Sequence, residues 1–228
     1  MSDVTRPTLP GSANRSGNPA EGDCEADCER AHEGGPGGQP PAQAGHGAPP
    51  VLLLQGWLGS GPGHWQRHWM QLRPHWQVVD FSSWEQPDPR GWRQALGTAV
   101  GACERPPLLI AHSLGCLAAA GLLAQPEAPP IAAALLVAPP DPGRPDTPAP
   151  LRPFHPVPRI RFGVPGQLLL SSDDPYAREA FALELASAWG LEPLCLGPLG
   201  HINAESGLGP WPEGLALADA LLERVAAG

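Results

Sequence analysis

The sequence contains no lysine, and all 14 of its basic residues are arginines. We interpret this absence as coding bias rather than function. Positive charge is also scarce, because 23 acidic residues outnumber the 14 arginines and give the chain a formal net charge of −9. Such a chain does not attract nucleic acid or an anionic membrane electrostatically, so neither is expected as a partner.

Long apolar runs are missing as well. No stretch reaches the ~20 apolar residues that a membrane-spanning helix needs, and residues 1–10 lack the basic and apolar regions of a secretory signal. The five cysteines are odd in number and widely scattered, which is typical of free thiols in a reducing compartment; they are Cys24, Cys28, Cys103, Cys116 and Cys195. We therefore expect a cytoplasmic protein.

Residues 1–48 have few aliphatic side chains and no aromatic ones, and are rich in Gly, Pro, Ser, Asp and Glu. Such a segment cannot bury enough apolar surface to offset the entropy of ordering. We expect a disordered tail here and one folded domain over residues 49–228. Cys24, Cys28 and His32 fall short of the four ligands of a closed zinc site, so no metal is expected.

From residue 49 on, short apolar runs alternate with segments of helical periodicity. This alternation predicts an α/β protein with a mostly parallel sheet of about six strands and helices on both faces. Residues 139–165 carry ten prolines and are expected to form an irregular loop, too short for a large cap domain. Strands are expected at residues 51–55, 76–81, 107–111, 131–138, 167–172 and 192–196, and helices at 65–72, 91–103, 114–121, 177–189 and 212–226.

The expected strand before Ser113 ends in Ala111-His112-Ser113-Leu114-Gly115 and passes into an Ala/Leu-rich helix. Small residues two before and two after a serine let strand and helix pass closely, as in the nucleophile elbow G-x-S-x-G. The alternative is a serine that only caps the helix. A second glycine-rich turn, residues 56–63, lacks the lysine and the glycine spacing of phosphate-binding loops, so nucleotide binding stays a minor alternative.

Polar residues follow two later strands, Asp173 and Asp174 after one and His201 after another. The carboxyl ends of parallel strands meet at one edge, where ligands bind. A nucleophilic serine needs a histidine base and a carboxylate that orients it, and the order Ser, Asp, His is that of α/β-hydrolases. The alternatives are a turn or helix cap at Asp-Asp-Pro and an ordinary loop at His201.

Two further histidines, His64 and His68, lie four residues apart before and within an expected helix whose buried face is Trp65, Trp69 and Leu72. No glutamate follows His64 as in H-E-x-x-H, so we expect surface histidines rather than zinc ligands.

The sequence resembles the small serine hydrolases of the YdeN and retinoblastoma-binding-protein-9 type, within the α/β-hydrolase superfamily. The resemblance covers about residues 51–226. It is carried by Gln55-Gly56-Trp57-Leu58-Gly59-Ser60-Gly61-Pro62 with His64-Trp65, Ala111-His112-Ser113-Leu114-Gly115-Cys116, Ser171-Ser172-Asp173-Asp174-Pro175-Tyr176, Gly200-His201-Ile202-Asn203, Ser206-Gly207-Leu208-Gly209 and Trp211-Pro212-Glu213-Gly214.

The resemblance implies an α/β-hydrolase fold with Ser113 as nucleophile, His201 as general base and acid, and Asp173 as the orienting carboxylate. Asp174 would then cap the next helix. The backbone N–H groups of Trp57 and Leu114 would form the oxyanion hole.

The same resemblance implies cleavage of a small ester, thioester or amide through an acyl-serine, without cofactor or metal. No partner protein is expected, because the L-x-C-x-E type motif linked to the mammalian relative's partner does not occur here. Trp57, Trp65, Trp84 and Tyr176 could line an acyl pocket or pack in the core. The alternative function is a catalytically silent binding or scaffold protein on this fold, with the acidic tail as its interaction element.

Overall fold

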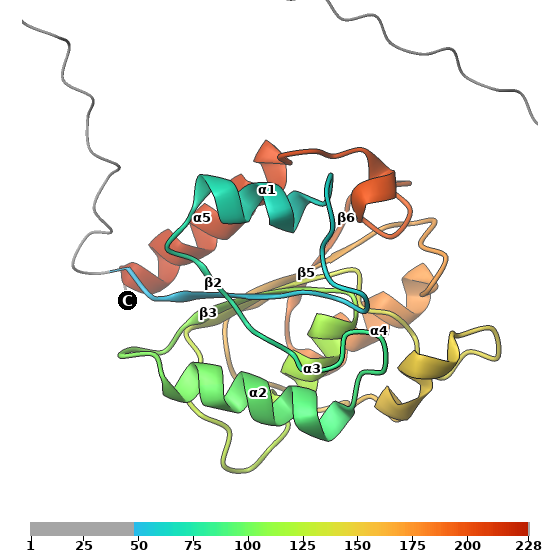
Figure 1. Ribbon diagram of the computed structural model, residues 1–228, viewed down its shortest axis with the longest axis horizontal. Helices are drawn as coiled ribbons and strands as arrows, with labels where there is room; N and C mark the ends of the chain where they lie inside the picture. Colours follow the sequence, from blue (N-terminus) through green and yellow to red (C-terminus); the bar gives the residue numbers. More distant parts are fainter. Residues whose placement is uncertain (1–47, 228) are drawn as a thin grey trace, which may run out of the picture. The chain divides into compact units, whose positions relative to one another are not determined.

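A six-stranded sheet lies at the centre of the computed structural model, which describes residues 48–227 (Figure 1). Its strand order is β2-β1-β3-β4-β5-β6, and every neighbouring pair is parallel. The predicted α/β architecture with a parallel sheet is confirmed. The strands are β1 (Val51–Leu54), β2 (Gln77–Val78), β3 (Leu108–His112), β4 (Ala133–Val137), β5 (Gly166–Leu170) and β6 (Glu192–Cys195).

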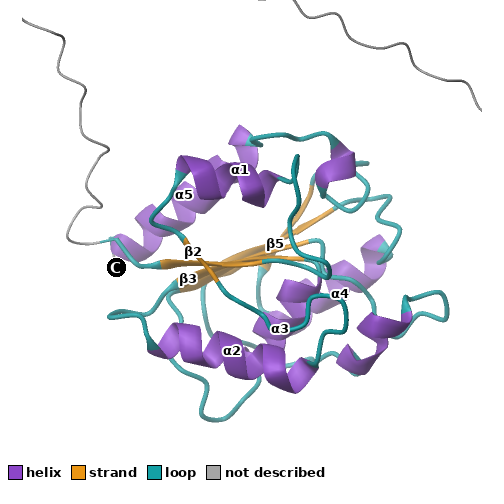
Figure 2. Cartoon of the chain, in the orientation of Figure 1, coloured by secondary structure: helices purple, strands orange, loops and turns teal. Residues whose placement is uncertain are grey.

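Helices cover both faces of the sheet, as Figure 2 shows. On one face lie α1 (Trp65–Leu72) and α5 (Pro212–Ala226). On the other lie α2 (Pro89–Gly101), α3 (Leu114–Leu123) and α4 (Glu179–Trp189). No helix in the described part of the chain is long and apolar enough to cross a membrane.

Each apolar strand contributes side chains to the core on both faces of the sheet, because successive side chains of a strand point to opposite faces. In β1, Leu52 and Leu54 join the cluster under α2, α3 and α4, whereas Val51 and Leu53 join the cluster under α1 and α5. All four are buried. Full burial of a side chain of this size contributes roughly 1.5–3 kcal/mol, so continuous apolar runs are what a sheet covered on both faces requires.

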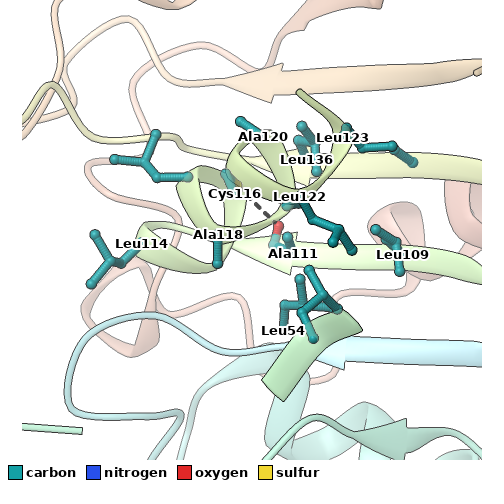
Figure 3. Packing of buried hydrophobic residues seen from close by; sticks show 14 of the residues in the cluster. Leu54, Leu109, Ala111, Leu114, Cys116, Ala118, Ala120, Leu122, Leu123 and Leu136 are labelled. Carbon is teal, nitrogen blue, oxygen red and sulfur yellow. Dashed lines mark hydrogen bonds between the residues drawn. The ribbon is translucent and has the colours of Figure 1, made fainter. Parts of the chain in front are cut away.

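Helix α3 is apolar almost all round because it lies between the sheet and α2, and nine of its ten residues are buried. Figure 3 shows its side chains among those of β1, β3 and β4. The Cys116 thiol donates to the backbone oxygens of Ala111 and Val137, at 3.4 and 3.3 Å. Burial raises the pKa of this thiol, so Cys116 is a packing residue and not a nucleophile.

Strand β2 is shorter than the expected strand over 76–81. It lies at the sheet edge and pairs only with Leu52 and Leu53 of β1. Beyond it the chain turns away from the sheet, and Phe81 stacks on Trp92 of α2 with ring centroids 4.3 Å apart. Packing against a helix therefore replaces pairing in the last part of the expected strand.

Other expectations fall outside the described residues or are met only in part. Most of the tail over 1–48, with Cys24, Cys28 and His32, lies outside the described residues. On α1, Trp65 and Trp69 are buried as predicted, whereas Leu72 is 52% exposed. The loop over 139–165 is mostly irregular but contains a short 3-10 helix, η1 (Ala149–Phe154).

Chain order reverses between β1 and β3, since the chain leaves β1 toward β2 and then returns on the other side to β3. Neighbouring loops diverge at such a point and leave a crevice at the carboxyl ends of the strands. The residues that follow β1 and β3 are the glycine-rich turn at Gly56 and Ser113. The fold thus places the glycine-rich turn and Ser113 next to each other at this crevice.

Candidate active site

Ser113 occupies the sharp turn between β3 and α3. Its φ of 53° and ψ of −123° lie in a region that residues with a Cβ rarely adopt, and its side chain makes no capping hydrogen bond to the helix. The alternative of a serine that merely caps α3 is therefore wrong. A strained backbone at this position holds the hydroxyl out of the helix and toward the crevice.

Gly115 is required by the close crossing of α3 over β1. A Cβ on this residue would lie 2.7 Å from the backbone oxygen of Leu54 and 2.8 Å from that of Gln55. A side chain would push the helix away from the strand. This contact explains the second small residue of the elbow pattern.

The Ser113 hydroxyl donates to Nε2 of His201 at 2.8 Å. Nδ1 of the same imidazole lies 2.9 Å from both carboxylate oxygens of Asp174. All three side chains are shielded from water, with exposed fractions between 4% and 8%. Hydroxyl, imidazole and carboxylate thus form one hydrogen-bonded series. In such a series the imidazole can accept the serine proton, and the carboxylate can stabilise the positive charge that the ring would then carry.

Asp173 does not contact the imidazole, which corrects the expectation that this residue orients His201. Its carboxylate accepts from the hydroxyl of Ser171 at 2.8 Å and from the Gly200 N–H at 2.7 Å. These bonds lower the pKa of the Asp173 carboxyl, the serine contact being the larger cause. The turn after β5 points Asp173 at the backbone of the His201 loop and Asp174 at its ring.

Asp174 does not cap α4 either. That helix begins at Glu179, and Asp174 instead accepts the Tyr176 N–H at 2.8 Å within its own turn. This bond holds the carboxylate in place while it faces His201.

The two backbone N–H groups expected in an oxyanion hole both lie beside Ser113. Leu114 begins α3, so its N–H is one of the free donors of a helix N-terminus. Trp57 follows Gly56, whose backbone passes so close that a Cβ there would lie 2.8 Å from the Cβ of Ser113. Neither N–H donates to another group within the described residues.

A cavity of about 290 Å³ opens over Ser113 and His201. Its apolar walls come from Trp57, Leu58, Leu151 of η1 and Tyr176, and Glu205 is an acidic residue of the lining. Two of the aromatics that the sequence offered for a pocket do not line it: Trp65 packs between Trp69 and Trp211, and Trp84 packs on Phe81 and Trp92.

Sequence reasoning offered Tyr176 as a pocket residue, which it is, but missed two histidines near His201, His64 and His112. The Tyr176 ring lies against the imidazole with centroids 4.5 Å apart. His64, expected at the surface, is buried, and it contacts His112, which precedes Ser113. The one sequence feature that could have indicated a role for His112 is its position next to Ser113. No feature of the sequence around His64 indicates that this residue is buried against the end of β3.

Within residues 48–227 no group of three or more His, Cys, Asp and Glu side chains is arranged to hold a metal ion.

The model of the serine hydrolase family matches residues 51–220 of this chain. The chain belongs to the serine hydrolase family. The match includes all the residues of the hydrogen-bonded series and both expected oxyanion donors. No curated protein sequence matches the chain.

One solved structure agrees with this family assignment, and two more distant ones share the fold. A protein described as a YdeN-like hydrolase, from Pectobacterium atrosepticum, is 33% identical, with a TM-score of 0.66 over 77% of this chain and 93% of its own. The ydeN gene product of Bacillus subtilis is 17% identical, with a TM-score of 0.65 over 77% and 99%. Est1E from Butyrivibrio proteoclasticus, solved with ferulic acid, is 11% identical, with a TM-score of 0.57 over 78% and 90%. These neighbours have the α/β-hydrolase fold.

Proposed function

We propose that this serine hydrolase cleaves small carboxylic esters through an acyl-Ser113 intermediate, with His201 as general base and acid and Asp174 as the orienting carboxylate. The observation that carries the proposal is the series in which Ser113 Oγ lies 2.8 Å from His201 Nε2 and His201 Nδ1 lies 2.9 Å from Asp174. Membership in the serine hydrolase family supports it.

In the first step, Ser113 Oγ attacks the ester carbonyl carbon while its proton moves to Nε2 of His201. The negative charge that develops on the carbonyl oxygen is stabilised by the N–H groups of Trp57 and Leu114, and the positive charge on the imidazole by Asp174. The bond to the leaving alcohol then breaks, and His201 returns the proton to the alcohol oxygen.

In the second step, water replaces the alcohol. His201 takes a proton from that water as the water oxygen attacks the acyl carbon, and the bond from Ser113 Oγ to the acyl carbon breaks. The proton returns to Oγ and the carboxylic acid leaves. The enzyme is restored, and one ester and one water have become one acid and one alcohol.

Size and lining of the cavity support a small, uncharged acyl group. Its volume of about 290 Å³ lies at the lower end of the range for ligand pockets. Among the described residues that line it there is no arginine to pair with an anionic substrate. Esters are favoured over amides because an alcohol leaves a tetrahedral intermediate more readily than an amine.

The three cysteines within the described residues support activity in a reducing compartment such as the cytoplasm. Cys103, Cys116 and Cys195 are all free thiols, as expected of a protein that works where disulfides do not persist.

A fluorophosphonate probe with a reporter tag tests the nucleophile. We expect labelling of the wild-type protein, and none of Ser113→Ala. The matched control is Ser187→Ala on the exposed side of α4, which should label like the wild type. Hydrolysis of p-nitrophenyl acetate, butyrate and octanoate should fall with chain length and vanish in Ser113→Ala. Labelling that persists in Ser113→Ala would contradict the proposal.

A further inference from the structure

Two histidines beside the site, His64 and His112, are buried although the proposed reaction does not use them. Each is only 4% exposed. His64 is the N-cap residue of α1, and His112 is the last residue of β3, directly before Ser113. Burying two imidazoles costs free energy unless their ring nitrogens are hydrogen-bonded.

The partners form one chain of hydrogen bonds. The Gln66 N–H lies 3.1 Å from His64 Nδ1, His64 Nε2 lies 3.3 Å from His112 Nδ1, and His112 Nε2 lies 3.0 Å from the backbone oxygen of His201. One end is a backbone N–H, which can only donate, and the other is a backbone oxygen, which can only accept.

These fixed ends determine every proton in between. Because His64 Nδ1 accepts, its proton is on Nε2 and is donated to His112 Nδ1. His112 must then carry its own proton on Nε2, which is donated to the His201 oxygen. Both rings are neutral, and all four ring nitrogens are satisfied.

The burial of His64 and His112 also favours the neutral form of both rings. It is the main cause that lowers the pKa of His64 to about 4, and it holds the pKa of His112 well below its ordinary value. Charge on the neighbouring His201 lowers both further. Neither ring is therefore expected to take up the Ser113 proton.

The backbone at His201 needs such support because the residues on either side adopt positive φ. The values are 56° at Gly200 and 48° at Ile202, and the second is strained because Ile has a branched Cβ. Three side chains from other elements bind the backbone of this segment: Asp173 accepts the Gly200 N–H, His112 donates to the His201 oxygen, and the Trp65 indole donates to the Ile202 oxygen at 2.8 Å.

We propose that His64 and His112 are positioning residues, which hold the main chain of His201 so that its imidazole stays within hydrogen-bonding distance of Ser113. This inference rests on the proposed function. Through the pair, α1 on one face of the sheet is connected to the loop that carries His201. A displacement of about 1 Å at a reacting group can cost on the order of 10²-fold in rate.

His64→Asn separates this role from simple folding. The asparagine oxygen can still accept the Gln66 N–H and cap α1, but the shorter side chain ends before His112. We expect kcat for p-nitrophenyl butyrate to fall about 10-fold to 100-fold, with KM changed less than threefold. The same substitution at His68, a half-exposed residue of the same helix, should leave both constants unchanged.

At His112 a pair of variants makes the matching comparison. His112→Phe removes both hydrogen bonds and should lower kcat at least as much as His64→Asn. His112→Gln places an amide donor near the former Nε2 and should recover part of the loss. Equal kcat for the wild type, His64→Asn and His112→Phe would overturn the proposal.

An NMR measurement on the wild type does not depend on turnover. Two-bond ¹H–¹⁵N correlation spectra at pH 7 should show His64 and His112 as neutral rings with the proton on Nε2. A proton on Nδ1 of either ring would overturn the proposal. If the wild type instead shows the expected tautomers but neither labels with fluorophosphonate nor cleaves esters, the proposed function fails and with it the positioning role.

Discussion

Asp173 and Asp174 are neighbours in the chain, yet they hold two different parts of the same loop. Asp173 accepts the backbone N–H of Gly200, and Asp174 accepts Nδ1–H of His201. One carboxylate therefore holds the main chain next to the histidine, and the other holds its imidazole ring.

This division of roles predicts different effects of the same substitution. Asp174→Asn should lower kcat about 10³-fold to 10⁴-fold, because the amide cannot balance an imidazolium and favours the wrong tautomer. Asp173→Asn keeps an oxygen that can accept the Gly200 N–H, so its effect should stay within about tenfold. Steady-state kinetics with p-nitrophenyl butyrate measure both, and a larger loss in Asp173→Asn than in Asp174→Asn would contradict the assignment.

The close crossing of α3 over β1 predicts a stability effect at Gly115. Gly115→Ala forces a methyl group against the backbone oxygens of Leu54 and Gln55, and we expect a loss of about 1–3 kcal/mol in the free energy of unfolding. Gly121 lies on the same helix with nothing within 4 Å of an added Cβ. Gly121→Ala should stabilise by up to about 1 kcal/mol. Urea unfolding measures both, and equal effects of the two substitutions would refute the packing argument.

Acid should destabilise the protein through the buried histidines. The folded-state pKa of His64 is about 4 and its ordinary value is 6.5, so the unfolded chain binds more protons between these two pH values. The free energy of unfolding is fully retained above pH 6.5 and falls as the pH decreases toward 4. Because each pH unit between the two pKa values corresponds to 1.36 kcal/mol, protonation of His64 alone should lower the free energy of unfolding by roughly 3 kcal/mol. His112 acts in the same direction.

Urea unfolding at pH 7, 6 and 5 measures this dependence. In His64→Asn the titrating ring is gone, so stability should fall less steeply with decreasing pH than in the wild type. His75 is exposed, and His75→Asn should keep the wild-type slope. An unchanged slope in His64→Asn would show that this ring does not titrate below its ordinary range.

The presence of Glu205 in the cavity lining predicts discrimination by charge. An ester whose acyl chain ends in a carboxylate should show a lower kcat/KM than a neutral ester of equal length, since two exposed charges about 4 Å apart repel by about 1 kcal/mol in water. Glu205→Gln should reduce the preference for the neutral ester about fivefold, and added salt should reduce it in the wild type. A preference that neither change affects would point to shape rather than charge.

The sequence by itself determined the alternation of strands and helices, the elbow at Ser113, and the order in which Ser113, the acid pair and His201 follow their strands. These features depend on local pattern and on the rule that parallel strands place their carboxyl ends at one edge. The side chains that meet there need not be close in the chain, and Ser113 and His201 are 88 positions apart.

Only the tertiary structure decided which aspartate faces the imidazole, how far β2 pairs, and that His64 is buried against His112. Two adjacent aspartates present the same chemistry to the sequence, and their directions are set by partners from a distant loop, the Gly200 N–H for one and the His201 ring for the other. His64 is likewise buried by packing of α1 against β3, a contact that no local pattern around residue 64 encodes.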